Sequence, residues 1–387
     1  MFRALRELAF ARGRFSLMGL VIGLIAVLMV LLSGLSAGLV NDGVSGLKSM
    51  RVSAFAFDEG PKTDNAFSRS VVDEEQLAAW QDRPEVAEAE LMGASIMNAV
   101  ADDGQQVDLT MFGVEPDGFL APEPVDGERV GDPAGIVVSE SLRGEGVDLG
   151  TVISLDRIDT ELEVIGFTDG QATFGHVDIA YLPLATWQLI AAGQAPADAA
   201  PTQEQLDALE FEQASVVALL GEGGSALADG DPEAFADGDA AARTTTMSLE
   251  ESFNASPGYQ AETLTLSMIQ WFLYAIGALV VGAFFTVWTI QRGHELAVLR
   301  AMGASAGYLL RDGLAQAAIL LVLFTGLGVA AGVGVGALMP EGMPFSLEAR
   351  PIAIASALTI LLGLVGAAVA VLRVTRIEPI SALGGTR

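Results

Sequence analysis

The sequence has no cysteine, only two histidines and few basic residues, with 20 Lys and Arg against 49 Asp and Glu. Without cysteine, disulfide bonds, metal–thiolate sites and thiol redox chemistry are excluded. The excess of acid argues against nucleic acid as a partner, because phosphate binding needs a basic surface. The composition therefore removes several classes of function before any motif is considered.

Common catalytic motifs are missing as well. The chain contains no GxxxxGK[ST] segment, so it cannot cradle ATP phosphates by that route. It also contains no HExxH, no GxSxG and no EF-hand loop. We therefore expect no enzymatic activity from the chain itself.

Charged residues are absent from four long apolar stretches, residues 15–41, 263–291, 313–340 and 351–372. A helix needs about 20 apolar residues to cross the hydrocarbon core of a bilayer, and each stretch is longer than that. We predict four membrane helices in a 1+3 arrangement, with a large domain (residues 42–262) inserted between the first and second. Because no stretch carries an ionisable carboxylate or base, ion-coupled transport and intramembrane proteolysis are disfavoured.

Basic residues predict the orientation of these helices. Arginine dominates three segments, residues 1–14, 292–312 and 373–387. Residues 41–266 instead carry 9 basic and 43 acidic residues, a net charge of −34. By the positive-inside rule, both termini and the 292–312 loop are cytoplasmic, whereas the inserted domain and the short loop 341–350 lie outside.

The N-terminal segment has an amphipathic pattern. Phe2, Leu5 and Leu8 recur at helical spacing, with arginines on the other face. We expect residues 1–14 to form a helix on the cytoplasmic membrane surface, although a plain basic flank to the first membrane helix would give a similar pattern.

Alternating apolar residues and turn signals predict an α+β fold for the inserted domain. The predicted strands are 52–57, 107–114, 135–139, 152–155, 162–167, 177–182 and 215–220, and the predicted helices are 74–80 and 183–192. Two segments rich in Ala, Gly, Pro and Asp, 191–201 and 221–242, are expected to be mobile loops.

The two histidines cannot share a site within one chain, because the predicted topology places His176 and His294 on opposite sides of the membrane. We expect His176 to be a structural residue beside a strand and His294 to belong to the cytoplasmic loop. We also expect no histidine near the outer halves of the membrane helices.

Glycines form a stripe on the third membrane helix, where Gly328, Gly332 and Gly336 recur every four residues, as Gly19 and Gly23 do in the first. Such small residues let two helices approach closely. The stripe predicts helix packing either within one chain or between two chains.

Several segments together resemble the FtsX/MacB-type permeases, also called type VII ABC transporter permeases. RGHELAVLRAMGAS (292–305) is similar to the family signature after the second helix, and RIEPISALGG (376–385) to its C-terminal element. GIVVSESLRGEGVDLGTVISL and LEVIGF, in the inserted domain, are similar to the outer-core strands. FGHVDIAYLPLATWQ is most similar to HrtB-like haem-exporter permeases and the related DevC-like group.

The resemblance implies a homodimeric permease in the membrane of a bacterial cell, paired with a separate cytoplasmic ABC ATPase that alone binds ATP and magnesium. It also implies that amphipathic cargo is taken from the outer leaflet or outer face. The family's ATPase-coupling helix maps onto Glu295, Leu296, Leu299, Arg300, Met302 and Gly303.

Haem is the substrate that the resemblance favours, and no intrinsic metal or cofactor is implied. If haem iron is ligated near the outer surface, Glu, Met or Tyr must do it, since no histidine is expected there. The candidates are Glu262, Tyr259, Glu251, Met50 and Met268, of which Glu262 comes first. Each of them could instead be an ordinary residue of the membrane interface.

Two other functions stay open. The chain could be an FtsX-like mechanotransmission protein that regulates an external cell-wall hydrolase, although its large inserted domain favours an exporter. It could also export a lipoprotein or peptide, and no sequence feature separates that function from haem export.

Overall fold

The computed structural model describes residues 12–60, 63–292, 298, 302–340 and 343–375. They form two compact units. The sheet unit comprises Val40–Glu262, and the helical unit comprises the described residues of Met1–Leu39 and Thr263–Arg387.

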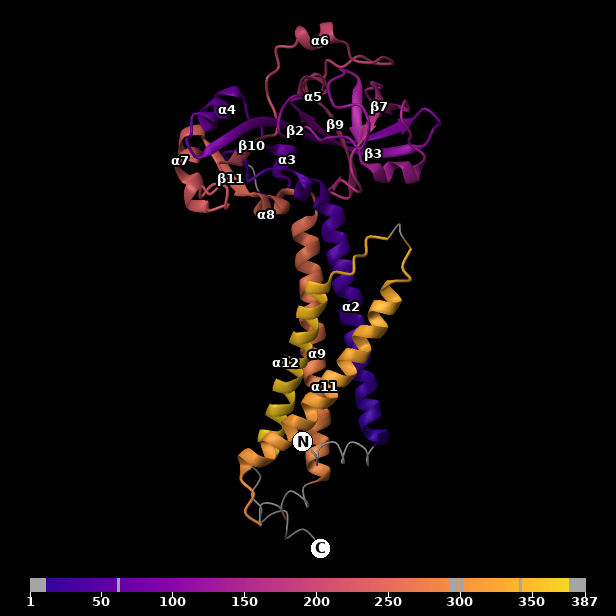
Figure 1. The fold of residues 1–387 in the computed structure, drawn as a ribbon, viewed down its shortest axis with the longest axis vertical. Coiled ribbons are helices and arrows are strands. Elements are labelled where there is room, and N and C mark those ends of the chain that lie inside the picture. The colour runs from indigo at the N-terminus through magenta and orange to yellow at the C-terminus, as the bar shows by residue number, and fades with distance from the viewer. Residues whose placement is uncertain (1–11, 61–62, 293–297, 299–301, 341–342, 376–387) are drawn as a thin grey trace. The chain divides into compact units, whose positions relative to one another are not determined.

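Four helices in the described part of the chain are long and apolar enough to cross a membrane (Figure 1). They are α2 (Arg12–Ser49), α9 (Tyr259–Gln291), α11 (Ala306–Gly336) and α12 (Ala349–Thr375). The predicted 1+3 fold class is therefore confirmed. The end of α2, from Val40, and the start of α9, as far as Glu262, belong to the sheet unit.

Helix ends differ from the ends of the charge-free stretches. α2 continues to Ser49, and α9 already begins at Tyr259. α11 begins at Ala306 because the hydroxyl of Ser305 caps it by accepting the N–H of Tyr308. A lack of charge marks the apolar part of a helix, whereas its hydrogen bonds continue into polar sequence until a cap or a break. Residues 1–11 of the expected surface helix lie outside the described residues.

The glycine stripe packs within one chain. A methyl group on Gly328 would overlap the carbonyl oxygen of Gly23, and one on Gly332 would press on Val30. In turn, the ring of Phe324 occupies the space that a side chain at Gly19 would need. The small residues therefore bring α2 and α11 close to backbone contact, which is the first of the two predicted alternatives.

Eleven strands in the described residues form the sheet of the sheet unit, in the order β11-β1-β10-β2-β3-β9-β5-β7-β4, with β6 beside β2 and β7 and with β8 beside β9. They are β1 (Ala54–Asp58), β2 (Val86–Ala101), β3 (Gln106–Val114), β4 (Asp126–Gly127), β5 (Gly135–Val138), β6 (Val152–Leu155), β7 (Glu161–Phe167), β8 (Thr173–Phe174), β9 (Val177–Pro183), β10 (Val216–Gly221) and β11 (Thr244–Ser248). The seven predicted strands are all present.

Apolar side chains cover both faces of this sheet, because successive residues of a strand point to opposite faces. On β1, Ala54 and Ala56 belong to one core, and Phe55 and Phe57 to the other. Helices pack around the sheet (Figure 1). They are α3 (Ala66–Arg69), α4 (Glu74–Gln81), η1 (Glu140–Glu145), α5 (Leu184–Ala191), α6 (Gln203–Asp207), α7 (Pro232–Ala242), α8 (Leu249–Ser252) and η2 (Phe253–Ala255).

Two elements correct the sequence-based predictions. The longest strand, β2, was not predicted, because its two glutamates and single glycine break the alternation of apolar residues. Segment 221–242, expected to be a mobile loop, contains α7, which begins with a capping Asp231 and Pro232 at its first position. α7 is held by packing, since Phe235 is buried and Gly238 lies against the ring of Trp80.

Candidate functional site

The hairpin formed by β8 and β9 presents a histidine at its tip. Its two turn residues, Gly175 and His176, both have positive φ angles, 62° and 65°. This is the backbone of a type I′ turn, which matches the twist of the two flanking strands. Glycine adopts it without strain, whereas a histidine in this region is uncommon. The turn therefore places the imidazole beyond the ends of the strands.

The same hairpin is hydrogen-bonded to the end of α2. The N–H of Gly175 donates to the carbonyl of Gly43 (2.9 Å), and the N–H of Thr173 donates to the hydroxyl of Ser45 (2.9 Å). α2 is kinked between these partners, since Val44 has a non-helical φ of −147°. Gly46 lies so close to Ile179 that a side chain would not fit. The hairpin and this end of the helix form one joint.

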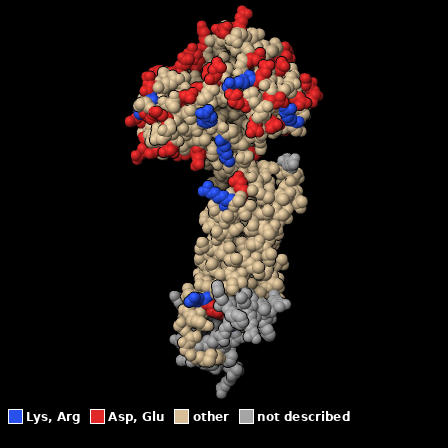
Figure 2. All heavy atoms as spheres, in the orientation of Figure 1, with Lys and Arg blue, Asp and Glu red and all other residues tan. Residues whose placement is uncertain are grey.

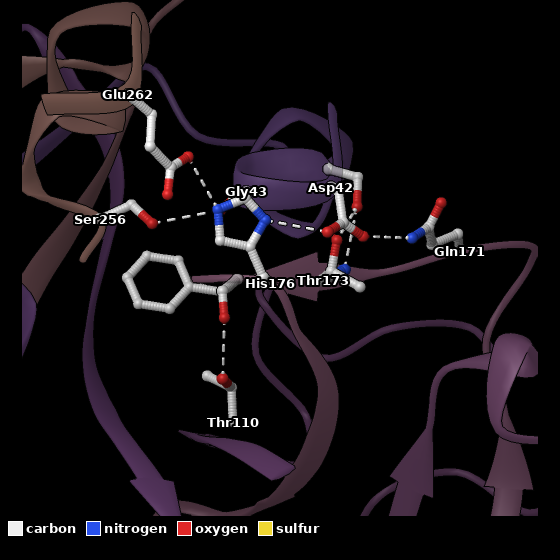
Figure 3. Close-up of polar contacts among 10 residues, drawn as sticks. Asp42, Gly43, Thr110, Gln171, Thr173, His176, Ser256 and Glu262 are labelled. Carbon is white, nitrogen blue, oxygen red and sulfur yellow. Dashed lines mark hydrogen bonds and ion pairs between the residues drawn. The ribbon is translucent and has the colours of Figure 1, made fainter. Parts of the chain in front are cut away.

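At this joint His176 bridges two carboxylates from two helices (Figure 3). Its Nδ1 lies 2.8 Å from Oδ2 of Asp42 in α2, and its Nε2 lies 2.9 Å from Oε2 of Glu262 in the first turn of α9. The amide of Gln171 donates to the other oxygen of Asp42 (2.8 Å), and the hydroxyl of Ser256 donates to the carbonyl of Gly43 (3.1 Å).

The bridge favours the imidazolium form of His176. Burial is the largest influence and lowers the pKa of the ring, but the hydrogen bonds and negative charges of Asp42 and Glu262 together raise it above its usual value. A neutral imidazole has one N–H and can donate to one carboxylate, whereas the imidazolium donates to both. The ring is partly open to solvent, with 27% of the side chain exposed.

The structure places the five candidate ligands differently. Glu262 takes part in the bridge, and Tyr259, one turn earlier in α9, packs its ring against Phe253 at 6.2 Å. Glu251 caps α8, where its carboxylate accepts the N–H of Ser248 (3.0 Å). Met50 is partly buried against one core, and Met268 is exposed on α9 in the helical unit.

We expected no histidine near the outer halves of the membrane helices, but one lies at the ends of α2 and α9 that belong to the sheet unit. His176 is hydrogen-bonded to Asp42 in α2 and to Glu262 in α9. We expected His176 to be a structural residue beside a strand, and that expectation gives its position on the hairpin but not these two bonds. Asp42 was missed as well. These partners are 134 and 86 residues from His176 along the chain, and periodicity carries no information on such pairings. The one local signal is the Gly-His pair between two strand-like runs.

The segment expected to couple to an ATPase is described in part. Glu295, Leu296, Leu299 and Arg300 lie outside the described residues. Met302 is 72% exposed, and its N–H donates to the carbonyl of Val298 (3.0 Å). Gly303 follows with a φ of 97°, a conformation that favours glycine. The coupling role stays a prediction.

Comparison with known proteins agrees with this architecture. The family model for the MacB-like periplasmic core domain matches residues 15–209, about half of the chain, and that for the FtsX-like permease C-terminal matches residues 267–379.

Curated relatives match from end to end. The "Putative hemin transport system permease protein HrtB" of Staphylococcus epidermidis is 23% identical over 386 residues, which cover 99% of both chains. The protein of the same name from Staphylococcus haemolyticus is 24% identical over 392 residues, again with 99% of both chains covered. The chain therefore belongs to the FtsX/MacB-like permeases, the membrane subunits of ABC transporters.

Proposed function

We propose that this chain is the permease of an ABC exporter that a separate cytoplasmic ATPase drives and that extrudes haem. The observation that carries the proposal is the end-to-end likeness to permeases named for hemin transport. It covers the sheet unit as well as the helices, and the sheet unit is where an exporter and a hydrolase regulator would differ most.

In this proposal two copies of the chain pair in the membrane of a bacterial cell, with both termini in the cytoplasm. ATP-driven closure of the ATPase moves the coupling segment, and the movement passes along α2 and α9 to the sheet unit. The arginine-rich flanks support the orientation. The absence of charge from the four apolar stretches supports transport without a polar channel through the bilayer.

The cargo would enter sideways from the outer leaflet. In the halves of α2 and α9 that adjoin the sheet unit along the chain, exposed apolar side chains are Leu28 on α2, and Met268, Phe272 and Ile276 on α9. A porphyrin ring is apolar and fits such surfaces, whereas its propionates prefer the aqueous interface. Both ring nitrogens of His176 are already paired with carboxylates, so we propose an oxygen or sulfur ligand for the iron. The candidates are Glu262 first, then Tyr259, Glu251, Met50 and Met268.

Haem titration of the full-length protein in lipid nanodiscs tests this function. We expect a shift of the Soret band on addition of haem to the wild-type protein, and its loss or alteration in Glu262→Ala. Glu250→Ala is the matched control, because Glu250 is an exposed carboxylate of α8. A wild-type protein with no spectral response would overturn haem as the substrate, and a response that Glu262→Ala leaves unchanged would remove only this ligand.

A further inference from the structure

We propose that His176 is a positioning residue for the capture of haem. Its ring holds one oxygen of the Glu262 carboxylate, so that the other oxygen faces the iron. The inference rests on the proposed function and adds a second residue to it. His176 does not touch the cargo, and it acts through Glu262.

The two oxygens of the Glu262 carboxylate have different surroundings. Oε2 lies 2.9 Å from Nε2 of His176. For Oε1, the structure shows no hydrogen bond among the described residues, and it lies next to Gly258. A methyl group on Gly258 would come within 3.1 Å of Oε1, so the glycine leaves this oxygen uncovered. Glu262 thus has one oxygen fixed by the protein and one accessible.

The imidazole is itself fixed on its far side. Asp42 accepts from Nδ1, and Gln171 holds the second oxygen of Asp42. The type I′ turn sets the backbone of His176, and the backbone bond from Gly175 to Gly43 in α2 holds the turn. The result is a chain of three side chains, Asp42, His176 and Glu262, in which each neighbour orients the next (Figure 3).

A carboxylate that is held in this way is a better iron ligand than a free one. An unheld glutamate samples several rotamers and must lose that freedom when it binds. Residues that hydrogen-bond a metal ligand typically contribute 10- to 100-fold in affinity, because they fix its orientation. Among the described residues, no group of three His, Cys, Asp or Glu side chains is arranged to hold a metal ion.

Two substitutions of His176 separate the two sides of the ring. In His176→Gln the amide nitrogen reaches roughly the position of Nε2 and still donates to Glu262. In His176→Asn it reaches roughly the position of Nδ1 and donates only towards Asp42. Asparagine also tolerates the positive φ of this position better than most residues do. Ser45→Ala is the structural control, because it removes two hydrogen bonds between Thr173 of the hairpin and α2 without touching the bridge.

The experiment measures haem affinity by Soret titration and metal-free porphyrin affinity by fluorescence, on full-length protein in nanodiscs. We expect His176→Asn to weaken haem binding roughly 10- to 100-fold. His176→Gln and Ser45→Ala should stay near wild type, and all variants should bind metal-free porphyrin equally. Should His176→Asn fail to fold, Asp42→Asn replaces it and should weaken haem binding in the same direction.

Three results would overturn the inference. Wild-type affinity for haem in His176→Asn would show that Glu262 needs no positioning. An equal loss for haem and metal-free porphyrin would point to a damaged groove, as would a loss in Ser45→Ala. A wild-type protein that shows no Soret response would instead overturn haem as the substrate, so the two failures are distinguishable.

Discussion

At the scale of single residues, the bridge at His176 depends on side chains that the hydrophobic periodicity of the sequence does not identify. Asp42 directly follows the first charge-free stretch and reads as the end of a membrane helix. In the structure it is a helical residue that anchors His176. Its role depends on which loop folds against it, and that choice is made by the whole sheet unit rather than by neighbouring residues.

The His176 bridge predicts a pH dependence. Because the pKa of His176 is raised, the bridge stabilises the folded state fully below the ordinary histidine value, near 6.5, and loses this stabilisation as pH rises through the raised pKa. Histidine-labelled full-length protein should give two ring signals by NMR, of which the one lost in His176→Asn titrates above ~6.5.

Asp42→Asn should lower the midpoint of that signal, since it removes one of the two negative charges that face the ring. A midpoint at or below the ordinary value in the wild-type protein would contradict the geometry of the bridge.

At the scale of elements, composition predicts more of the helical unit than of the sheet unit. Four helices follow from the lack of charge, because lipid requires apolar sequence along a whole span. β2 and α7 were not predicted from the sequence, because contacts with distant parts of the chain stabilise them. β2 lies between β10 and β3 and so is paired along both edges, and α7 is held by Trp80. The hairpin strands were partly predicted, yet their contact with α2 was not.

The glycine stripe gives a test within one helix. Gly328→Ala should destabilise the protein by about 1–3 kcal/mol, because the added methyl overlaps the backbone of Gly23 and the helices must move apart. Gly326→Ala is the matched control, since a side chain there meets no atom within 4 Å.

Thermal unfolding in detergent measures both variants. The Gly326→Ala protein should melt at or slightly above the wild-type temperature, because alanine is the better helix former. Equal melting of the two variants would mean that α2 and α11 do not pack closely through Gly328.

At the scale of the whole molecule, charge is divided unequally between the units. The charged side chains on the visible face of the sheet unit are mostly acidic (Figure 2). Its ion pairs, such as Arg83 with Glu85 and Arg129 with Glu123, are partly or largely exposed. Exposed pairs contribute little, so they do not offset the mutual repulsion of the carboxylates.

Salt should therefore stabilise this protein. Raising the ionic strength shortens the Debye length from about 10 Å at 0.1 M to about 3 Å at 1 M, which screens the repulsion. We expect the melting temperature to rise with sodium chloride, and to rise less at acidic pH, where the carboxylates are protonated. A melting temperature that falls with salt would show that attractive pairs dominate.

The predicted orientation is also tested on the whole molecule. Met302→Cys and Glu250→Cys place single thiols at exposed positions in a chain without native cysteine. An impermeant thiol reagent should label Glu250→Cys in intact cells and Met302→Cys only after permeabilisation. The reverse labelling pattern would show that the chain has the opposite orientation in the membrane.

The strand order has a consequence for how the chain is made. β1 is synthesised early, but its neighbours in the sheet are β10 and β11, whose registers pair Phe55 with Ala218 and with Met247. Until those residues leave the ribosome, β1 remains an unpaired apolar edge that other chains could join. α9 begins soon after β11, at Tyr259. The sheet is therefore completed at about the time that the second membrane helix is inserted, and the interval before it is when the nascent chain most needs protection.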